Sequence, residues 1–327
     1  MQNLLDPAIL FFIFGVLAGA VRSNLEIPPA ISRFLSLYLL MALGLKGGFA
    51  LSVSGLTSTV AISLAAAVAL AIYVPLIGYF FLKRFVSGFD AAAVAATYGS
   101  VSAVTFVTAV QYLENQGVSY GGHMAAAMAL MESPAIIMAV VFANALRQRA
   151  GVAAEVVAAS LKPKVSIRKI LHESFTDGAQ LLLIGAMAIG LLTGESGKAA
   201  MQPFSGDLFK GMLSFFLLDM GLMAARNLPQ VRGKSPVLVA YAVVGPMVHA
   251  ALALALAYAL QLSAGDGALL MVLAASASYI AVPAVLRYAL PESNPSLYFG
   301  LSLGVTFPLN ILFGIPVYAS IAKAVLS

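Results

Sequence analysis

Ten long apolar runs, each near the ~20 residues that a helix needs to cross a bilayer, cover most of this 327-residue chain. Backbone N–H and C=O groups find no partner in lipid, so such runs fold as helices that satisfy their own polar groups. Only 9% of the residues are charged, against about 25% in soluble domains, and the mean hydropathy is +0.97. The sequence therefore predicts an all-α integral membrane protein.

The same composition excludes several classes of function. The net charge of +5 comes from loops between the apolar runs and gives no argument for nucleic-acid binding. The chain has no cysteine, which excludes disulfides and thiolate sites. It has no Gly-x-Ser-x-Gly elbow and no P-loop, so we expect neither an enzyme nor use of ATP. The three histidines are scattered, so no metal site is expected other than one for sodium.

The apolar runs define ten predicted spans. One sizeable hydrophilic stretch, rich in basic residues, follows the fifth span. It divides the chain into a first half at 1–147, a cytoplasmic linker at 148–177 and a second half at 178–327. The spans lie at about 7–23, 29–51, 58–82, 89–113, 120–146, 178–194, 206–226, 235–262, 266–290 and 296–325.

The two halves resemble each other. Three stretches of the first half have counterparts in the second half, in the same order and at offsets of 171, 177 and 176 residues. A nearly constant offset indicates duplication of a five-span unit. The pairs are 8–20 with 179–191, 37–51 with 214–228 and 99–112 with 275–288.

The distribution of basic residues indicates the orientation. Five spans are an odd number, so the second half must enter the membrane in the opposite sense. If the N-terminus is outside, fourteen of the eighteen Lys and Arg residues fall at cytoplasmic ends, as the positive-inside rule requires. We therefore expect an inner (plasma) membrane protein with both termini outside and a 5+5 inverted repeat, which is typical of secondary transporters.

Equivalent points of the fourth and ninth spans carry clusters of small and hydroxyl residues. A Ser-x-Ser pair does not share one face of a helix, because each residue turns by about 100°. The pairs therefore predict broken helices whose N-termini and hydroxyls surround an anion. Packing between helices is the alternative role for such residues. The candidate substrate-binding residues are Gly99, Ser100, Ser102, Thr105, Ser276, Ser278 and Tyr279.

Polar residues inside other spans are candidates for a coupling ion. A charge at mid-bilayer costs about 2.5–3.5 kcal/mol even on insertion scales, so such residues are functional candidates. Glu132 lies mid-span before Pro134, and its counterpart in the second half contains Thr306 and Asn310. Hard cations such as sodium prefer the oxygen ligands that these residues offer. Asp219 is a further candidate, with helix pairing as its alternative role.

With these motifs the chain resembles the sodium-dependent bicarbonate transporter family (SbtA-like permeases) known from cyanobacteria. The resemblance runs over nearly the whole chain and has ordered motifs. They include IPPAIS at 27–32, GLKGGFAL at 44–51, YGSVSAVTF at 98–106, MESPAII at 131–137, VFANAL at 141–146, AASASYIAVPAVLR at 274–287 and SNPSLYFG at 293–300.

The resemblance implies a core moving against a scaffold, a homotrimer, and sodium-coupled uptake of bicarbonate between the fourth and ninth spans. It assigns Ser100, Ser102 and Thr105 to one half of the anion site, and Ser276 and Ser278 to the other. The chain differs at Tyr279, where cyanobacterial members carry an aspartate. Its linker is also short, which argues against the PII-like regulatory partner that the family suggests.

The sequence as a whole predicts import of a small anion, first of all bicarbonate, by sodium symport with alternating access. One alternative is transport of another small organic anion or solute, since Tyr279 makes the site more apolar. A different class of function is a channel or a non-transporting sensor that keeps the fold.

Overall fold

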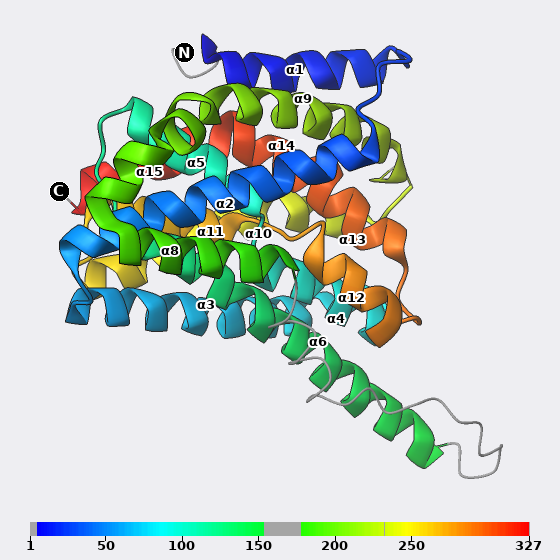
Figure 1. The fold of residues 1–327 in the computed structure, drawn as a ribbon. Coiled ribbons are helices and arrows are strands. Elements are labelled where there is room, and N and C mark those ends of the chain that lie inside the picture. Colours follow the sequence, from blue (N-terminus) through cyan, green and yellow to red (C-terminus); the bar gives the residue numbers. More distant parts are fainter. Residues whose placement is uncertain (1–4, 154–177, 232, 327) are drawn as a thin grey trace.

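The computed structural model describes residues 5–153, 178–231 and 233–326, which form helices and no strands. Figure 1 shows their arrangement. The helices are α1 (Pro7–Ala20), α2 (Pro29–Ser54), α3 (Ser58–Leu82), α4 (Gly88–Gly99), α5 (Ala103–Asn115), α6 (Met124–Ala153), α8 (Gly178–Met201), α9 (Phe209–Asn227), α10 (Pro236–Ala259), α11 (Ala264–Ala275), α12 (Ala281–Ala289), α13 (Pro295–Leu301), α14 (Phe307–Leu309) and α15 (Ile315–Leu326). Short π-helical turns join α13, α14 and α15.

Seven helical stretches in the described residues are long and apolar enough to cross a membrane. One of them, Gly178–Val231, holds both α8 and α9 and therefore covers two of the predicted spans. Two shorter apolar helices, α1 and α11, occupy further predicted spans. Each of the ten predicted ranges thus contains a helix or a set of successive helices, and the all-helical membrane architecture agrees with the sequence.

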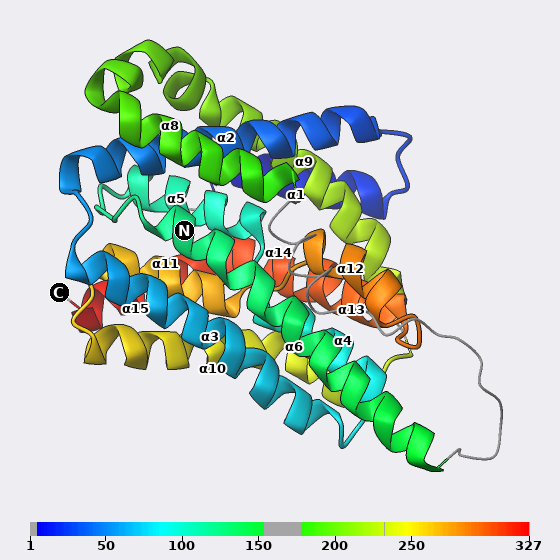
Figure 2. The same ribbon diagram turned by 60° about the horizontal axis from the view of Figure 1, so that its bottom comes forward.

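Helices α1, α2, α8 and α9 form one side of the molecule, which we call the four-helix layer (Figure 2). In this layer α2 packs along α8 and α1 along α9. Glycines allow the close approach: a Cβ on Gly48 would lie 2.1 Å from the carbonyl oxygen of Met187, and one on Gly15 would lie 2.2 Å from that of Leu218. Such distances are far below van der Waals contact, so both crossings require a residue without a side chain.

The remaining helices, α3–α6 and α10–α15, form what we call the larger helical body. Helix α3 packs on α4 and α6, while α10 and α15 pack on α11. Helices α4 and α11 lie at its centre, and every residue from Ala91 to Gly99 and from Gly265 to Ala275 is buried. The two interrupted spans are therefore the most enclosed part of the fold.

Helices α4 and α11 begin and end in the same way. Ser87 caps α4 by accepting from the N–H of Asp90 at 3.1 Å, and Ser263 caps α11 by accepting from the N–H of Asp266 at 3.1 Å. An N-cap serine satisfies one of the orphan N–H groups of the first turn, and an acid there complements the helix dipole. Both helices have 12 residues. The interruptions expected in the fourth and ninth spans are present, after Gly99 and after Ala275.

Two helical stretches extend beyond the predicted spans. In α8 the first helical segment ends at Gly194, the predicted end of the sixth span, where φ 55° and ψ −140° are not helical, and a second segment follows the kink to Met201. Helix α6 continues to Ala153, and its end projects from the molecule (Figures 1 and 2). The basic residues predicted for the linker beyond Ala153 lie outside the described residues.

Candidate functional site

The breaks in the two interrupted spans cross and are hydrogen-bonded to each other. The N–H of Ser102 donates to Ser276 Oγ at 3.0 Å, and the N–H of Ser278 donates to the carbonyl oxygen of Thr97 at 2.8 Å. Ser276 Oγ in turn donates to the carbonyl oxygen of Leu273 at 2.9 Å. Backbone groups freed by each break are therefore satisfied by the other break, as buried polar groups require.

Local features explain why the helices stop here. Ser100 and Ser276, the C-caps of α4 and α11, have extended backbones with ψ 177° and ψ 167°. The residue just before the first break must be a glycine, since a Cβ at position 99 would lie 2.5 Å from the ring of Pro75 in α3. Ser102 then caps the new helix α5, accepting from the N–H of Thr105 at 3.2 Å.

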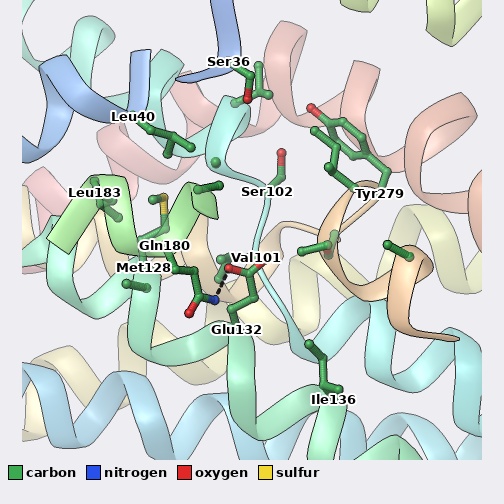
Figure 3. A pocket seen from close by; sticks show the side chains of 18 of the residues that line it. Ser36, Leu40, Val101, Ser102, Met128, Glu132, Ile136, Gln180, Leu183 and Tyr279 are labelled. Carbon is green, nitrogen blue, oxygen red and sulfur yellow. Dashed lines mark hydrogen bonds between the residues drawn. The ribbon is translucent and has the colours of Figure 1, made fainter. Parts of the chain in front are cut away.

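A cavity of about 240 Å³ lies beside the crossing, between the four-helix layer and the larger helical body, and we call it the crossing cavity. Figure 3 shows side chains of both parts around it. The layer contributes Ser36, Leu40, Ala179, Gln180 and Leu183, and the body contributes Val101, Ser102, Ala103, Val104, Met128, Ala129, Glu132, Ile136, Ser278, Tyr279, Ile280, Ala281, Ala284 and Val285. Its walls are therefore mostly apolar, with a few polar groups.

Hydrogen-bond donors face this cavity from the start of α5. Ser102 Oγ accepts from both the N–H and the hydroxyl of Thr105, at 3.2 and 2.9 Å. A serine oxygen has two lone pairs and one proton, so the Ser102 hydroxyl is left to act as a donor. The N–H groups of Ala103 and Val104, in the first turn of α5, have no acceptor in the described part of the chain.

A second set of donors comes from the other break. Ser278 Oγ accepts from the N–H of Val282 at 3.3 Å, which leaves its own proton available. Ala281, the first residue of α12, also lines the cavity. Two helix N-termini, each with a serine hydroxyl, thus contribute to one wall, and helix N-termini favour negative charge.

One carboxylate lies in the same cavity. Glu132 projects from α6, and one of its oxygens, Oε2, accepts a hydrogen bond from Gln180 Nε2 of α8 (Figure 3). Among the described residues that line the cavity, none is a Lys, Arg or His. The cavity therefore combines donors suited to an anion with an acid suited to a cation.

The structure brings four of the sequence-predicted site residues to the cavity, namely Ser102, Ser278, Tyr279 and Glu132. The Tyr279 hydroxyl donates to Met220 Sδ of α9 at 3.7 Å, and its ring lies 5.2 Å from that of Phe307. Four other predicted residues lie at the crossing without lining the cavity: Gly99, Ser100, Thr105 and Ser276. They shape the breaks, and Ser100 Oγ is buried with no hydrogen-bond partner among the described residues.

The remaining predicted ion ligands lie elsewhere. Thr306 Oγ1 donates to the carbonyl oxygen of Ala242 at 2.7 Å and is 2.6 Å from the Tyr98 hydroxyl. Asn310 Nδ2 donates to the carbonyl oxygen of Ala275 at 2.8 Å, which ties α15's preceding turn to the end of α11. Both residues line a separate cavity of about 50 Å³, so the structure does not place them with Glu132.

Asp219 lies in α9 and is only 6% exposed. Its Oδ2 has no hydrogen-bond partner among the described residues, and Asp219 does not line the crossing cavity. The neighbouring Met220 is the contact of Tyr279. Asp219 is therefore a buried acid in the layer, close in sequence to the point where the layer meets the second break.

Sequence reasoning missed Gln180 and Ser36, the polar residues that the four-helix layer adds to the cavity. Each stands in an apolar run, and such an isolated polar residue is the signal that identified Glu132. Gln180 stands in the repeated stretch 179–191, but its counterpart at the offset of 171 is Ile9, and Ser36 lies just before the repeated stretch 37–51, so the comparison of the two halves did not point to them.

A second cavity, of about 520 Å³, lies at the other end of α2 and α8. There Lys46 Nζ of α2 pairs with Glu114 Oε2 of α5 at 3.0 Å, and the Tyr120 hydroxyl donates to Glu114 Oε1 at 2.9 Å. Asn115 Nδ2 also donates to Asp6 Oδ2 at 3.0 Å. The layer and the body are thus joined by polar contacts at this end.

A family profile described as the Na+-dependent bicarbonate transporter superfamily matches residues 7–323. The match covers nearly the whole chain, including both breaks and every residue that lines the cavity. A comparison with curated proteins found no match.

Proposed function

We propose that this chain, which belongs to the Na+-dependent bicarbonate transporter superfamily, imports a small anion by sodium symport, with bicarbonate as the first candidate. The observation that carries the proposal is the convergence of two interrupted spans on one cavity. The starts of α5 and α12 supply helix N-termini, and Ser102 and Ser278 supply hydroxyl donors. A bicarbonate ion offers only acceptor oxygens and one hydroxyl, so this donor set matches it.

Among the described residues, the proposed anion site has no basic side chain, and a cation would balance the charge of the anion. Glu132 lines the same cavity and is the acid best placed to hold sodium beside the anion. Binding the two ions together cancels most of their charge, which lowers the cost of carrying each through a low-dielectric site. Asp219 is a second candidate for an ion, whereas Thr306 and Asn310 use their polar groups within the body.

The fold also supports a proposed 5+5 inverted repeat. At the offset of 176 residues seen in the sequence, the capping residues Ser87 and Asp90 correspond to Ser263 and Asp266, and α4 corresponds to α11 in length. The layer repeats the relation, because α1 packs on α9 while α2 packs on α8. Each half therefore contributes its first helix to a contact with the second helix of the other half.

We further propose that the four-helix layer is the scaffold and that the larger helical body moves against it. The crossing cavity reaches the start of α8, next to the linker expected in the cytoplasm. At the other end, Lys46 and Glu114 join the layer and the body. This arrangement fits the inward-facing state of an alternating-access cycle. The expected homotrimer and the sidedness of the termini stay predictions.

One observation favours a second candidate substrate. The cavity of about 240 Å³ is large beside a four-heavy-atom anion, and Leu40, Leu183 and Met128 make much of its wall apolar. A short organic acid would place its carboxylate at the donors and its hydrocarbon part against these side chains. This alternative uses the same anion-binding wall.

The test is uptake of labelled bicarbonate by the full chain in proteoliposomes, with and without an inward sodium gradient. We expect uptake that depends on the gradient and is lost in Glu132→Gln. Sodium-driven uptake of a labelled short-chain carboxylate, with none of bicarbonate, would select the second candidate. No uptake of either solute would remove transport and favour a sensor with this fold.

A further inference from the structure

The hydrogen bond between Gln180 and Glu132 joins the four-helix layer to the larger helical body inside the crossing cavity. Gln180 lies in the first turn of α8, in the four-helix layer, and its side chain is 6% exposed. Glu132 lies 48 residues earlier, on α6 of the larger helical body. The bonded atoms are an amide nitrogen of the layer and a carboxylate oxygen of the body, and both residues line the cavity (Figure 3).

The chemistry of this bond bears on cation binding. Sodium is held by oxygen atoms, and a carboxylate is the strongest such ligand in the cavity. An amide N–H directed at the same carboxylate uses lone-pair density that a cation needs, and the nitrogen itself cannot serve as a ligand. In this arrangement the Gln180 amide and a cation therefore compete for Oε2 of Glu132, one of the two carboxylate oxygens.

The two partners are fixed to different parts of the fold. Helix α8 is held against α2, since a Cβ on Gly44 would lie 2.4 Å from the carbonyl oxygen of Leu183 and one on Gly190 would lie 2.6 Å from that of Leu45. Helix α6 packs mainly on α3, α4 and α12 of the body, with smaller contacts to α2 and α8 of the layer. A displacement of the body along the layer would therefore separate Gln180 from Glu132.

We propose that Gln180 is a positioning residue that displaces the coupling cation: its amide bonds Oε2 of Glu132 in the arrangement seen here and withdraws from that oxygen when the body moves. The inference rests on the proposed function, in which Glu132 holds sodium. It adds a role for the layer, which would promote release of the cation on the side to which the crossing cavity opens.

The experiment measures binding of radioactive sodium to the purified full-length protein. Gln180→Met keeps the size of the side chain and removes the amide. Because a hydrogen bond to a charged group is worth about one power of ten in an equilibrium constant, we expect the variant to bind sodium about tenfold more tightly. Gln180→Leu serves as a second variant should the first fail to fold, as judged by gel filtration.

Two controls make the result specific. Gln202→Met removes an amide that lines the second cavity instead and donates to Asp207 Oδ1 at 3.0 Å, and it should leave sodium affinity unchanged. Glu132→Gln should abolish the binding. Net sodium-driven uptake should fall in Gln180→Met because release becomes slow, a readout that a purely structural role would not link to tighter binding.

The outcomes separate this inference from the proposed function. If wild-type protein binds sodium through Glu132 and Gln180→Met binds it equally well or more weakly, the displacement role is wrong while the coupling role stands. Weaker binding would make Gln180 a ligand of the ion. If wild-type protein binds no sodium, or if Glu132→Gln binds it normally, both the inference and the proposed cation site fall.

Discussion

Ser276 Oγ accepts a hydrogen bond from the backbone N–H of Ser102 at 3.0 Å, so a side chain of one interrupted span satisfies the backbone of the other. At the repeat offset of 176 residues, the counterpart of Ser276 is Ser100. Ser100 Oγ is buried too, but it has no hydrogen-bond partner among the described residues. Two equivalent serines therefore differ in what they contribute to the crossing.

Replacing Ser276 by alanine should destabilise the fold. The variant leaves the N–H of Ser102 buried without its acceptor, and an unsatisfied buried donor costs about 1–3 kcal/mol. Thermal unfolding in detergent without substrate should show a lower midpoint for Ser276→Ala than for the wild type. Ser100→Ala is the matched control and should unfold near the wild-type temperature, because no bond is lost. Equal loss in the two variants would contradict this account of the crossing.

The ion pair of Lys46 and Glu114 should help to hold the layer and the body together at the end opposite the crossing cavity. Their side chains are 21% and 33% exposed, so the pair contributes less than about 1 kcal/mol. Lys46→Ala should therefore shift the equilibrium between the arrangement seen here and one closed around the crossing cavity by less than about fivefold, toward the closed arrangement. The chain has no native cysteine, so a Ser36→Cys probe inside that cavity should be alkylated more slowly in this background.

Lys198→Ala is the control for that measurement. Lys198 lines the second cavity, as Lys46 does, but its partner is Glu195 on the same helix at 3.6 Å, so it joins no separate parts of the fold. Alkylation of Ser36→Cys should keep its wild-type rate in this variant. A rate that is also unchanged in Lys46→Ala would show that the pair does not hold this end closed.

The contact between α2 and α8 should be intolerant of a single added methyl group. A Cβ on Gly48 would lie 2.1 Å from the carbonyl oxygen of Met187 and 2.7 Å from the backbone nitrogen of Leu191. Gly48→Ala must push the helices apart, and such overpacking costs about 1–3 kcal/mol. Gly185→Ala on α8 meets no atom within 4 Å, and it should be neutral or stabilising by up to about 1 kcal/mol through helix propensity. Thermal unfolding of the two variants compares them directly.

The breaks in the interrupted spans were predictable because their cause is local. Ser100 with Ser102, and Ser276 with Ser278, have a spacing that a continuous helix cannot place on one face, and their positions recur at a constant offset. Apolar length likewise predicted the helices, because each must satisfy its backbone in lipid. Helix ends were less predictable: α6 continues to Ala153, beyond the predicted end at 146, whereas the kink of α8 at Gly194 falls at the predicted end of the sixth span.

The proposed cation site was only partly predictable, because its composition depends on how separate helices pack. Glu132 was found as an acid in an apolar run, but its partner Gln180 comes from the other half of the chain. Thr306 and Asn310 were grouped with Glu132 by the correspondence of the halves. In the fold their polar groups bond carbonyl oxygens of Ala242 and Ala275 instead, as freed backbone groups demand.

The hydroxyls of Ser102 and Ser278 should each contribute to anion binding. Each oxygen already accepts at least one hydrogen bond, so its proton can be donated to a ligand in the cavity, in competition with the Tyr279 hydroxyl at Ser102. A hydrogen bond to a charged ligand contributes about 1.5–3 kcal/mol, so Ser102→Ala and Ser278→Ala should each weaken the affinity for the anion at least tenfold. The measurement is the concentration of unlabelled anion that halves labelled uptake. Ser302→Ala is the control, since Ser302 Oγ donates to the carbonyl oxygen of Tyr298 within its own helix and does not line the cavity. Wild-type affinity in both site variants would return the two serines to helix packing, and the anion would then depend on backbone N–H groups such as those of Ala103 and Val104.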